Sequence, residues 1–156
     1  MRHTLKKVTI ALLGFLSFFS AENLWGQSNA DLNPEQVQAF NNYHHEIVEC
    51  VIFYNISIDG MKRRAGSEET VAIYQSISDT LLKRAMVVSD IIGMKDETIA
   101  ARLQMAATAQ LEEIDQNFVN ISILMEKYLT SCKAVFVDPE SRILFWYGKE
   151  VDAPPS

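Results

Sequence analysis

The sequence predicts an all-α protein, an antiparallel helical bundle of three to four helices followed by a short C-terminal helix rich in aromatic side chains. Apolar residues recur at alternating steps of three and four through most of the chain, which is the spacing of one helix face. Capping residues and glycines stand at the ends of these stretches. A strand signal is confined to the short run AVFV at 134–137. The length of 156 residues suits a single domain of this kind, expected over residues 34–148.

Residues 1–26 are predicted to be a secretory signal peptide. Arg2, Lys6 and Lys7 precede an uncharged apolar run over residues 8–19, which is too short to span a bilayer comfortably. Cleavage after Gly26 is favoured over cleavage after Ala21, and an uncleaved anchor is the competing interpretation. Residues 27–33 then form an N-terminal extension, and the expected location is periplasmic or secreted.

The first helix is expected to start at Pro34 and to run to about residue 65. Asn33 is placed to cap it, and Gln36 can complete a capping box. Gly60 weakens the helix interior, so a bend or an earlier end near Asp59 is the alternative. The apolar stripe of this helix consists of Val37, Phe40, His44, Ile47, Val51, Tyr54, Ile58, Met61 and Ala65.

Two further segments follow along the chain. Gly66 ends the first helix, Ser67 caps a second, and Gly93 closes that one. Asp96 is expected to cap a third segment, residues 97–136, which contains neither glycine nor proline. Taken literally, this segment is one helix of about forty residues, roughly 60 Å long at 1.5 Å per residue. A turn near residues 115–117 would instead divide it into two helices of more usual length.

Cys50 and Cys132 are the only cysteines, and in an exported chain they are expected to form one disulfide. An unbroken third helix would carry Cys132 roughly 37 Å beyond the level of Cys50. Bridged Cα atoms lie within about 7 Å of each other, so the cysteine pair favours the turn at 115–117 and four helices. A disulfide from one of these cysteines to a second chain, which would make a homodimer, is the remaining alternative.

Two nearly identical hexapeptides occur, FYNISI at 53–58 and FVNISI at 118–123. Both are expected on helices, and packing explains them better than internal duplication because their flanks differ. Each contains a glycosylation sequon, at Asn55 and at Asn120, but glycan acceptors belong on exposed loops. The hypothesis for Asn55 and Asn120 is therefore a shared polar contact in the core that fixes helix register.

The segment DPESRILFWYG at 138–148 predicts the short C-terminal helix, which Gly148 should end. Residues 149–156 are then expected to be a disordered tail. Three consecutive aromatic residues point about 100° apart on a helix, so they cannot all enter one core. Folding of the segment as a lid over the bundle is the alternative to a binding surface. The residues predicted to contact a protein partner are Phe145, Trp146, Tyr147 and Arg142.

One local cluster, HHEIVEC at 44–50, could hold a ligand or a metal ion. His45 and Glu49 are four residues apart on one helix face, whereas His44 lies on the apolar stripe. Two ligands do not complete a metal site, and no Glu-x-x-His pair accompanies them, so no cofactor is predicted. An enzyme is not predicted either, because Gly-x-Ser-x-Gly and the glycine-rich phosphate loops are missing from the sequence.

Charge narrows the class of partner. Removal of residues 1–26 takes three basic and one acidic residue from totals of 14 and 20, which leaves 11 against 19 and a net charge of −8. Nucleic acids and anionic membrane surfaces need a cationic face, so neither is expected. The predicted function is that of a non-enzymatic exported protein that binds another envelope protein as an adaptor, inhibitor or neutralising partner. The second hypothesis is a small-ligand or metal-binding bundle with a pocket near His44, Tyr54 and Asn120.

Overall fold

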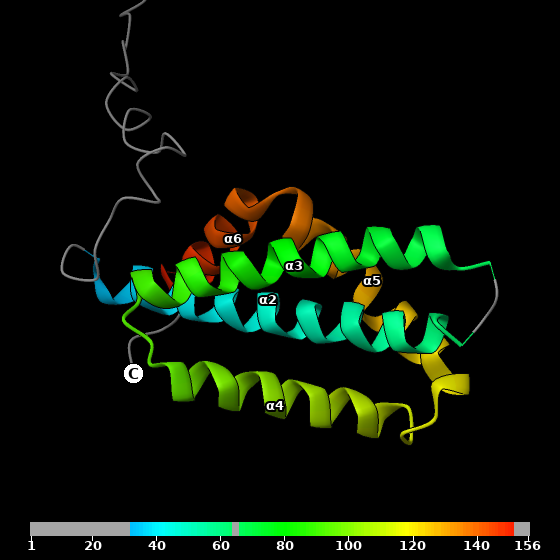
Figure 1. Ribbon diagram of the computed structural model, residues 1–156. Helices are drawn as coiled ribbons and strands as arrows, with labels where there is room; N and C mark the ends of the chain where they lie inside the picture. The colour runs from blue at the N-terminus through cyan, green and yellow to red at the C-terminus, as the bar shows by residue number, and fades with distance from the viewer. Residues whose placement is uncertain (1–31, 64–65, 152–156) are drawn as a thin grey trace, which may run out of the picture.

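The computed structural model describes residues 32–63 and 66–151 (Figure 1). The predicted signal peptide, most of the N-terminal extension and tail residues 152–156 lie outside the described residues. The described part contains five α-helices and no strand, which confirms the all-α prediction. No helix in these two ranges is long and apolar enough to cross a membrane.

The central element is α2 (Pro34–Met61), against which α3, α4, α5 and α6 all pack (Figure 1). Its predicted capping box is present. The Gln36 N–H donates to Asn33 Oδ1 at 2.8 Å, and the Asn33 N–H donates to Gln36 Oε1 at 2.9 Å. The helix ends at Met61, between the two ends that the sequence allowed.

The next two helices, α3 (Glu68–Ile91) and α4 (Asp96–Glu113), lie on opposite sides of α2 (Figure 1). Gly66 and Gly93 precede them with φ angles of +81° and +65°, a backbone conformation that glycine adopts without strain. Ser67 occupies the N-cap position of α3 as predicted, but its Oγ donates to the Met61 carbonyl at 2.8 Å and makes no cap bond to α3. Lys95, and not the predicted Asp96, occupies the N-cap position of α4. Asp96 lies in the first turn of α4, where a negative charge still stabilises the helix.

The third predicted segment forms two helices. After α4 the chain makes a 3₁₀ turn, η2 (Phe118–Asn120), and continues as α5 (Ile121–Val137). Asp115 and Gln116 turn the backbone with φ angles of +52° and +54°. The Gln116 N–H bonds the Leu111 carbonyl at 2.7 Å, which closes the end of α4. The break therefore occurs where the cysteine pair favours it, although no glycine marks the position.

The two hexapeptides occupy unlike places in the fold. FYNISI lies inside α2, whereas FVNISI begins in η2 and continues into α5, so the prediction that both copies sit within helices is wrong for the second. Gly60 lies where the two regions meet. A Cβ at Gly60 would lie 3.4 Å from Phe118 Cδ1 and 3.8 Å from Ile121 Cγ1. These are ordinary van der Waals distances, so the start of α5 packs against α2 at Gly60 without requiring glycine there.

The last helix, α6 (Pro139–Val151), packs against α2 and α5. Asp138 Oδ1 accepts a hydrogen bond from the Ser141 N–H at 3.1 Å, which caps the helix. Hydrogen bonding by the Ser141 side chain, together with this backbone bond, lowers the pKa of the Asp138 carboxyl. The helix passes through Gly148 and ends three residues later, so the predicted end at Gly148 and the tail from residue 149 are corrected. One glycine weakens a helix by roughly 0.5–1 kcal/mol without terminating it.

The hydrophobic core surrounds α2, and one disulfide lies within it. Fully buried side chains include Tyr43 and Phe53 of α2 and Leu81 of α3, and the Phe53 and Tyr128 rings stack 6.0 Å apart. The Sγ atoms of Cys50 and Cys132 lie 2.10 Å apart, so a disulfide joins α2 to α5 across 82 residues of sequence. Both cysteines are buried, which places this link inside the core.

Candidate functional site

The predicted aromatic residues divide between the surface and the core. Phe145 is 41% exposed and the neighbouring Leu144 is 45% exposed. Trp146 and Tyr147 are half-buried, and Trp146 packs against the hydrophobic core. The exposed group, which we call the α6 surface, consists of Leu144, Phe145 and Lys149, with Arg142 at its edge.

Two cations approach the exposed ring of the α6 surface. Arg142 Cζ and Lys149 Nζ each lie 4.4 Å from the centre of the Phe145 ring. Lys149 Nζ also lies 5.2 Å from the Trp146 ring, which meets Phe145 edge-on. A cation over an aromatic face is attracted by the ring electrons. The α6 surface therefore combines apolar area with positive charge in a chain that is acidic as a whole.

Arg142 also ties α6 to α2. Its Nε donates to Glu46 Oε2 at 3.2 Å, and its Nη2 pairs with Glu46 Oε1. The side chains are only 24% and 15% exposed, so this two-point pair is shielded from water. Trp146 Nε1 is buried nearby without an acceptor among the described residues. Arg142 is therefore first a structural contact and only secondarily part of a surface.

His44 is a core residue, as expected, but it belongs to a polar network that the sequence did not indicate. Its Nδ1 lies 3.2 Å from Arg102 Nη1, and its Nε2 lies 2.8 Å from Ser89 Oγ. Arginine only donates, so Nδ1 accepts and Nε2 carries the hydrogen. Ser89 Oγ accepts that hydrogen and donates its own to the Ala85 carbonyl at 2.8 Å. Burial, reinforced by the charge of Arg102, lowers the pKa of His44 to about 4.

His45 and Glu49 lie beside the His44 network, on the part of α2 that faces the same pocket as Arg102. Their Nε2 and Oε1 atoms are 3.8 Å apart, and the side chains are 63% and 35% exposed. Both ring nitrogens of His44 are occupied, so the three predicted ligand residues do not converge on one point. Over residues 32–63 and 66–151, no group of three or more histidine, cysteine or acidic side chains is placed to hold a metal ion.

His45 and Glu49 instead line a pocket of about 420 Å³ between α2 and α4. We call it the α2–α4 pocket. The second hypothesis placed a pocket near His44, Tyr54 and Asn120. None of these three residues lines the α2–α4 pocket, and Tyr54 is buried with its ring packed edge-on against Tyr74. A single arginine on an amphipathic helix gives no sequence signal, so Arg102 was missed. The lining residues are Asn41, Asn42, His45 and Glu49 from α2 and Arg102, Met105, Ala106 and Ala109 from α4.

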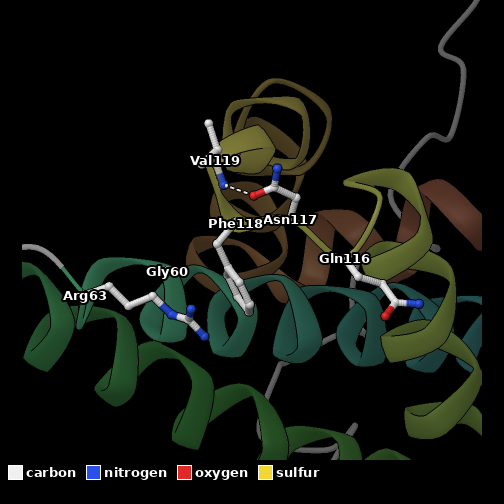
Figure 2. Close-up of a pocket in the computed structure, with 6 residues that line it drawn as sticks. All are labelled: Gly60, Arg63, Gln116, Asn117, Phe118 and Val119. Atoms are coloured by element: carbon white, nitrogen blue, oxygen red, sulfur yellow. Dashed lines mark hydrogen bonds between the residues drawn. The ribbon is translucent and has the colours of Figure 1, made fainter.

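A second hollow of about 360 Å³ lies beyond the C-terminal part of α2 (Figure 2). Asn117 Oδ1 accepts from the Val119 N–H at 3.1 Å, and Arg63 Cζ lies 4.5 Å over the Phe118 ring (Figure 2). These contacts hold the turn that leads into α5. Gly60 and Gln116 complete the lining of the hollow. The hollow is the space that remains where this turn packs against α2.

The shared polar contact expected for Asn55 and Asn120 does not form. Asn55 is exposed, and its Oδ1 accepts from Ser78 Oγ at 2.9 Å. Asn120 is half-buried, and its Nδ2 donates to the Ile114 carbonyl at 3.2 Å. The hypothesis placed Asn120 inside a helix facing α2. It is wrong because Asn120 lies at the end of η2 and serves the turn.

Comparisons with protein-family models, with curated proteins and with solved structures each found no match to this chain. The class that the fold and its surfaces define is a helical, disulfide-linked protein with an aromatic, cationic surface on α6 and a pocket between α2 and α4.

Proposed function

We propose that this chain is an exported, non-enzymatic protein, an antiparallel helical bundle, that binds another protein of the cell envelope through the α6 surface as an adaptor, inhibitor or neutralising partner. The observation that carries the proposal is the exposed Phe145 ring with two cations 4.4 Å from its centre. Large aromatic side chains and arginine are favoured anchors of protein interfaces. Export is supported by residues 1–26 and by the Cys50–Cys132 disulfide, since disulfides persist in oxidising compartments.

The chemistry of the α6 surface specifies the partner. Leu144 and Phe145 offer apolar contact, while Lys149 adds a positive charge that already sits over two rings. A matching surface would present an apolar hollow for the ring and carboxylates at its edge, because complementary charge directs association. The partner is accordingly an acidic-rimmed protein surface.

Crosslinking tests this proposal directly. A photoreactive amino acid replaces Phe145 in one variant and Met105, which is 71% exposed on α4, in a matched control. Irradiation in envelope extract should attach one discrete protein at position 145 and none at position 105. Trp146 is less suitable, because its ring contributes to the core and its removal would disturb folding.

Two results would contradict the proposal. The first is the same set of adducts from both positions, which would show unspecific contact. The second is an adduct of twice the chain mass from position 145, which would make a second copy of this chain the occupant. A Phe145→Ser variant should compete at least tenfold less well than the unmodified protein for the crosslinked partner, since a buried interface anchor contributes roughly 2 kcal/mol or more.

A further inference from the structure

We infer that the α2–α4 pocket binds a small molecule with one carboxylate and an apolar body, the carboxylate meeting Arg102 and the body lying along α4. This site is separate from the α6 surface and does not depend on it. Its volume of about 420 Å³ falls within the range of small-ligand pockets.

Arg102 is held in position by hydrogen bonds from α4 to α2. Its Nη2 donates to Asn41 Oδ1 at 2.7 Å, and its Nη1 contacts the Asn41 carbonyl at 3.5 Å and His44 Nδ1 at 3.2 Å. A guanidinium has five N–H groups, so the Nε hydrogen and one on Nη2 are not used in these bonds. All three acceptors are neutral, because His44 stays uncharged at pH 7. The positive charge is thus positioned but not neutralised.

Arg102 has no counter-ion among the described residues. The ion pairs of the described residues involve Glu49, Asp59, Glu113 and Glu46, and none of them includes Arg102. Arg102 is half-buried, and its burial lowers the pKa of the guanidinium without discharging it. A charge removed from water is stabilised by an opposite charge, and a planar carboxylate matches the two free donors of a guanidinium.

The remaining walls define the rest of the ligand. Met105, Ala106 and Ala109 form an apolar side, and Met105 is 71% exposed although it is a large hydrophobic residue. Glu49 lies eight residues after Asn41 on α2, which is about 12 Å along the helix. Its carboxylate would repel a second negative group at that end. The pocket should therefore select a monocarboxylate over a dicarboxylate of the same length.

The test uses sodium hexanoate as a probe for the disulfide-bonded protein, followed by nuclear magnetic resonance. Saturable shifts are expected at the Arg102 Nε–H and at the methyl groups of Met105, Ala106 and Ala109. Hexan-1-ol, which lacks the charge, should leave the Arg102 signal unchanged. Adipate, which carries a carboxylate at each end, should bind several-fold more weakly than hexanoate.

Variants separate binding from folding. Arg102→Gln should weaken hexanoate binding by about tenfold or more, since it removes a charge-assisted pair. That variant also disturbs His44, so Ala109→Glu serves as the second. This variant leaves every Arg102 bond in place and puts a negatively charged side chain on the apolar side of the pocket. It should therefore weaken hexanoate binding by a similar factor. Lys95→Gln removes an exposed charge just before α4, outside the pocket lining, and should change the affinity less than twofold.

Glu49→Gln provides a gain of affinity for adipate, because removal of the repelling carboxylate should bring adipate close to hexanoate in affinity. The inference is overturned if hexanoate produces no saturable shift, if hexan-1-ol moves the Arg102 signal equally, or if Ala109→Glu binds as tightly as the unmodified protein. Inorganic phosphate competing as strongly as hexanoate would show an anion site without a place for an apolar body, and would overturn the carboxylate assignment. None of these outcomes alters the expectation for Phe145, so the two proposals stand or fall separately.

Discussion

The two sides of α2 accommodate arginine in different ways. On the side covered by α5 and α6, Arg142 meets the carboxylate of Glu46, and Arg84 Nη1 donates to the Val135 carbonyl at 2.7 Å and the Phe136 carbonyl at 3.3 Å. Carbonyls in the last turn of a helix lack partners within it and carry partial negative charge. Arg84 therefore completes the end of α5, and both arginines hold helices together.

On the side covered by α4, the arginine has no carboxylate among its hydrogen-bond acceptors. Arg102 contacts only neutral groups and lines an open pocket, although it is half-buried like the other two arginines. Arg142 meets a carboxylate and Arg84 meets carbonyls at the end of a helix, so both act as structural links. Arg102 meets neither a carboxylate nor a helix-end carbonyl and lines a pocket, which leaves its charge available to an external anion.

The largest effect is expected from removal of the disulfide, which lies on the closed side. Replacing Cys50 and Cys132 by alanine frees a loop spanning 82 residues of sequence and should lower the free energy of unfolding by about 4–5 kcal/mol. Urea unfolding followed by circular dichroism measures this loss. Reductant should destabilise the unmodified protein by a similar amount and leave the double variant unaffected. Equal unfolding midpoints for the two proteins would contradict the prediction.

The next largest effect is the pH dependence of the free energy of unfolding, which arises from His44, the histidine that contacts Arg102. The pKa of His44 is about 4 in the folded protein and about 6.5 in an unfolded chain. Between these values the unfolded chain takes up a proton that the folded chain does not, so the free energy of unfolding falls as pH is lowered from 6.5 to 4. The full loss is about 3 kcal/mol, and it levels off below pH 4.

Denaturant unfolding at a series of pH values measures this dependence. His44→Gln should remove the part of the slope that lies between pH 6.5 and 4, whereas His45→Gln, on the exposed side of α2, should retain it. Acidic groups titrate at the lower end of the same range, so the difference between the two variants is the quantity to compare. Identical slopes of unfolding free energy against pH in both variants would show that His44 binds its proton in the folded state as readily as in the unfolded chain.

A smaller effect is expected at the link between α6 and α2. Arg142→Met leaves the Glu46 carboxylate shielded and without its partner, which should lower the free energy of unfolding by about 2 kcal/mol. A double variant, Arg142→Met with Glu46→Leu, should recover part of that loss, because no charge then remains unpaired. The double-mutant cycle is read from thermal or urea unfolding. Additive losses would show that the two side chains do not interact.

The smallest effect is expected at the exposed pair that connects the end of α4 to α5. Lys127 Nζ lies 2.7 Å from Glu113 Oε1, and this hydrogen bond raises the pKa of Lys127 to about 12. The lysine side chain is 55% exposed, so water screens the pair, and Lys127→Met should change stability by less than about 1 kcal/mol. A larger change in urea unfolding would mean that this pair holds α4 in place.

Much of the helix layout follows from local chemistry. The Asn33–Gln36 box, the positive-φ glycines at 66 and 93 and the Asp138 cap act within a few residues of themselves, so the sequence indicates them. The break at 115–117 was favoured by a distance argument from two cysteines. It has no local signal of its own, because Asp115 and Gln116 adopt their turn conformation without glycine.

The pocket and the polar network could not be predicted in this way. Arg102 reaches Asn41 and His44 across about sixty positions of sequence, and such a contact depends on how two helices are placed together. The Asn55 and Asn120 hypothesis failed for a related reason. Identical residues within similar hexapeptides took different roles because one copy lies inside α2 and the other forms the turn before α5.

The Cys50–Cys132 link also makes the chain a covalent ring with two arms. The ring runs from the second half of α2 to most of α5, while α6 and the start of α2 extend from it on either side. A protease that cuts once at the exposed Gly93 opens the ring but releases no fragment until the disulfide is reduced. Glu46 and Arg142 lie on the two arms, so their contact stays tethered close to the ring junction, and a nicked molecule retains the elements that carry the α6 surface.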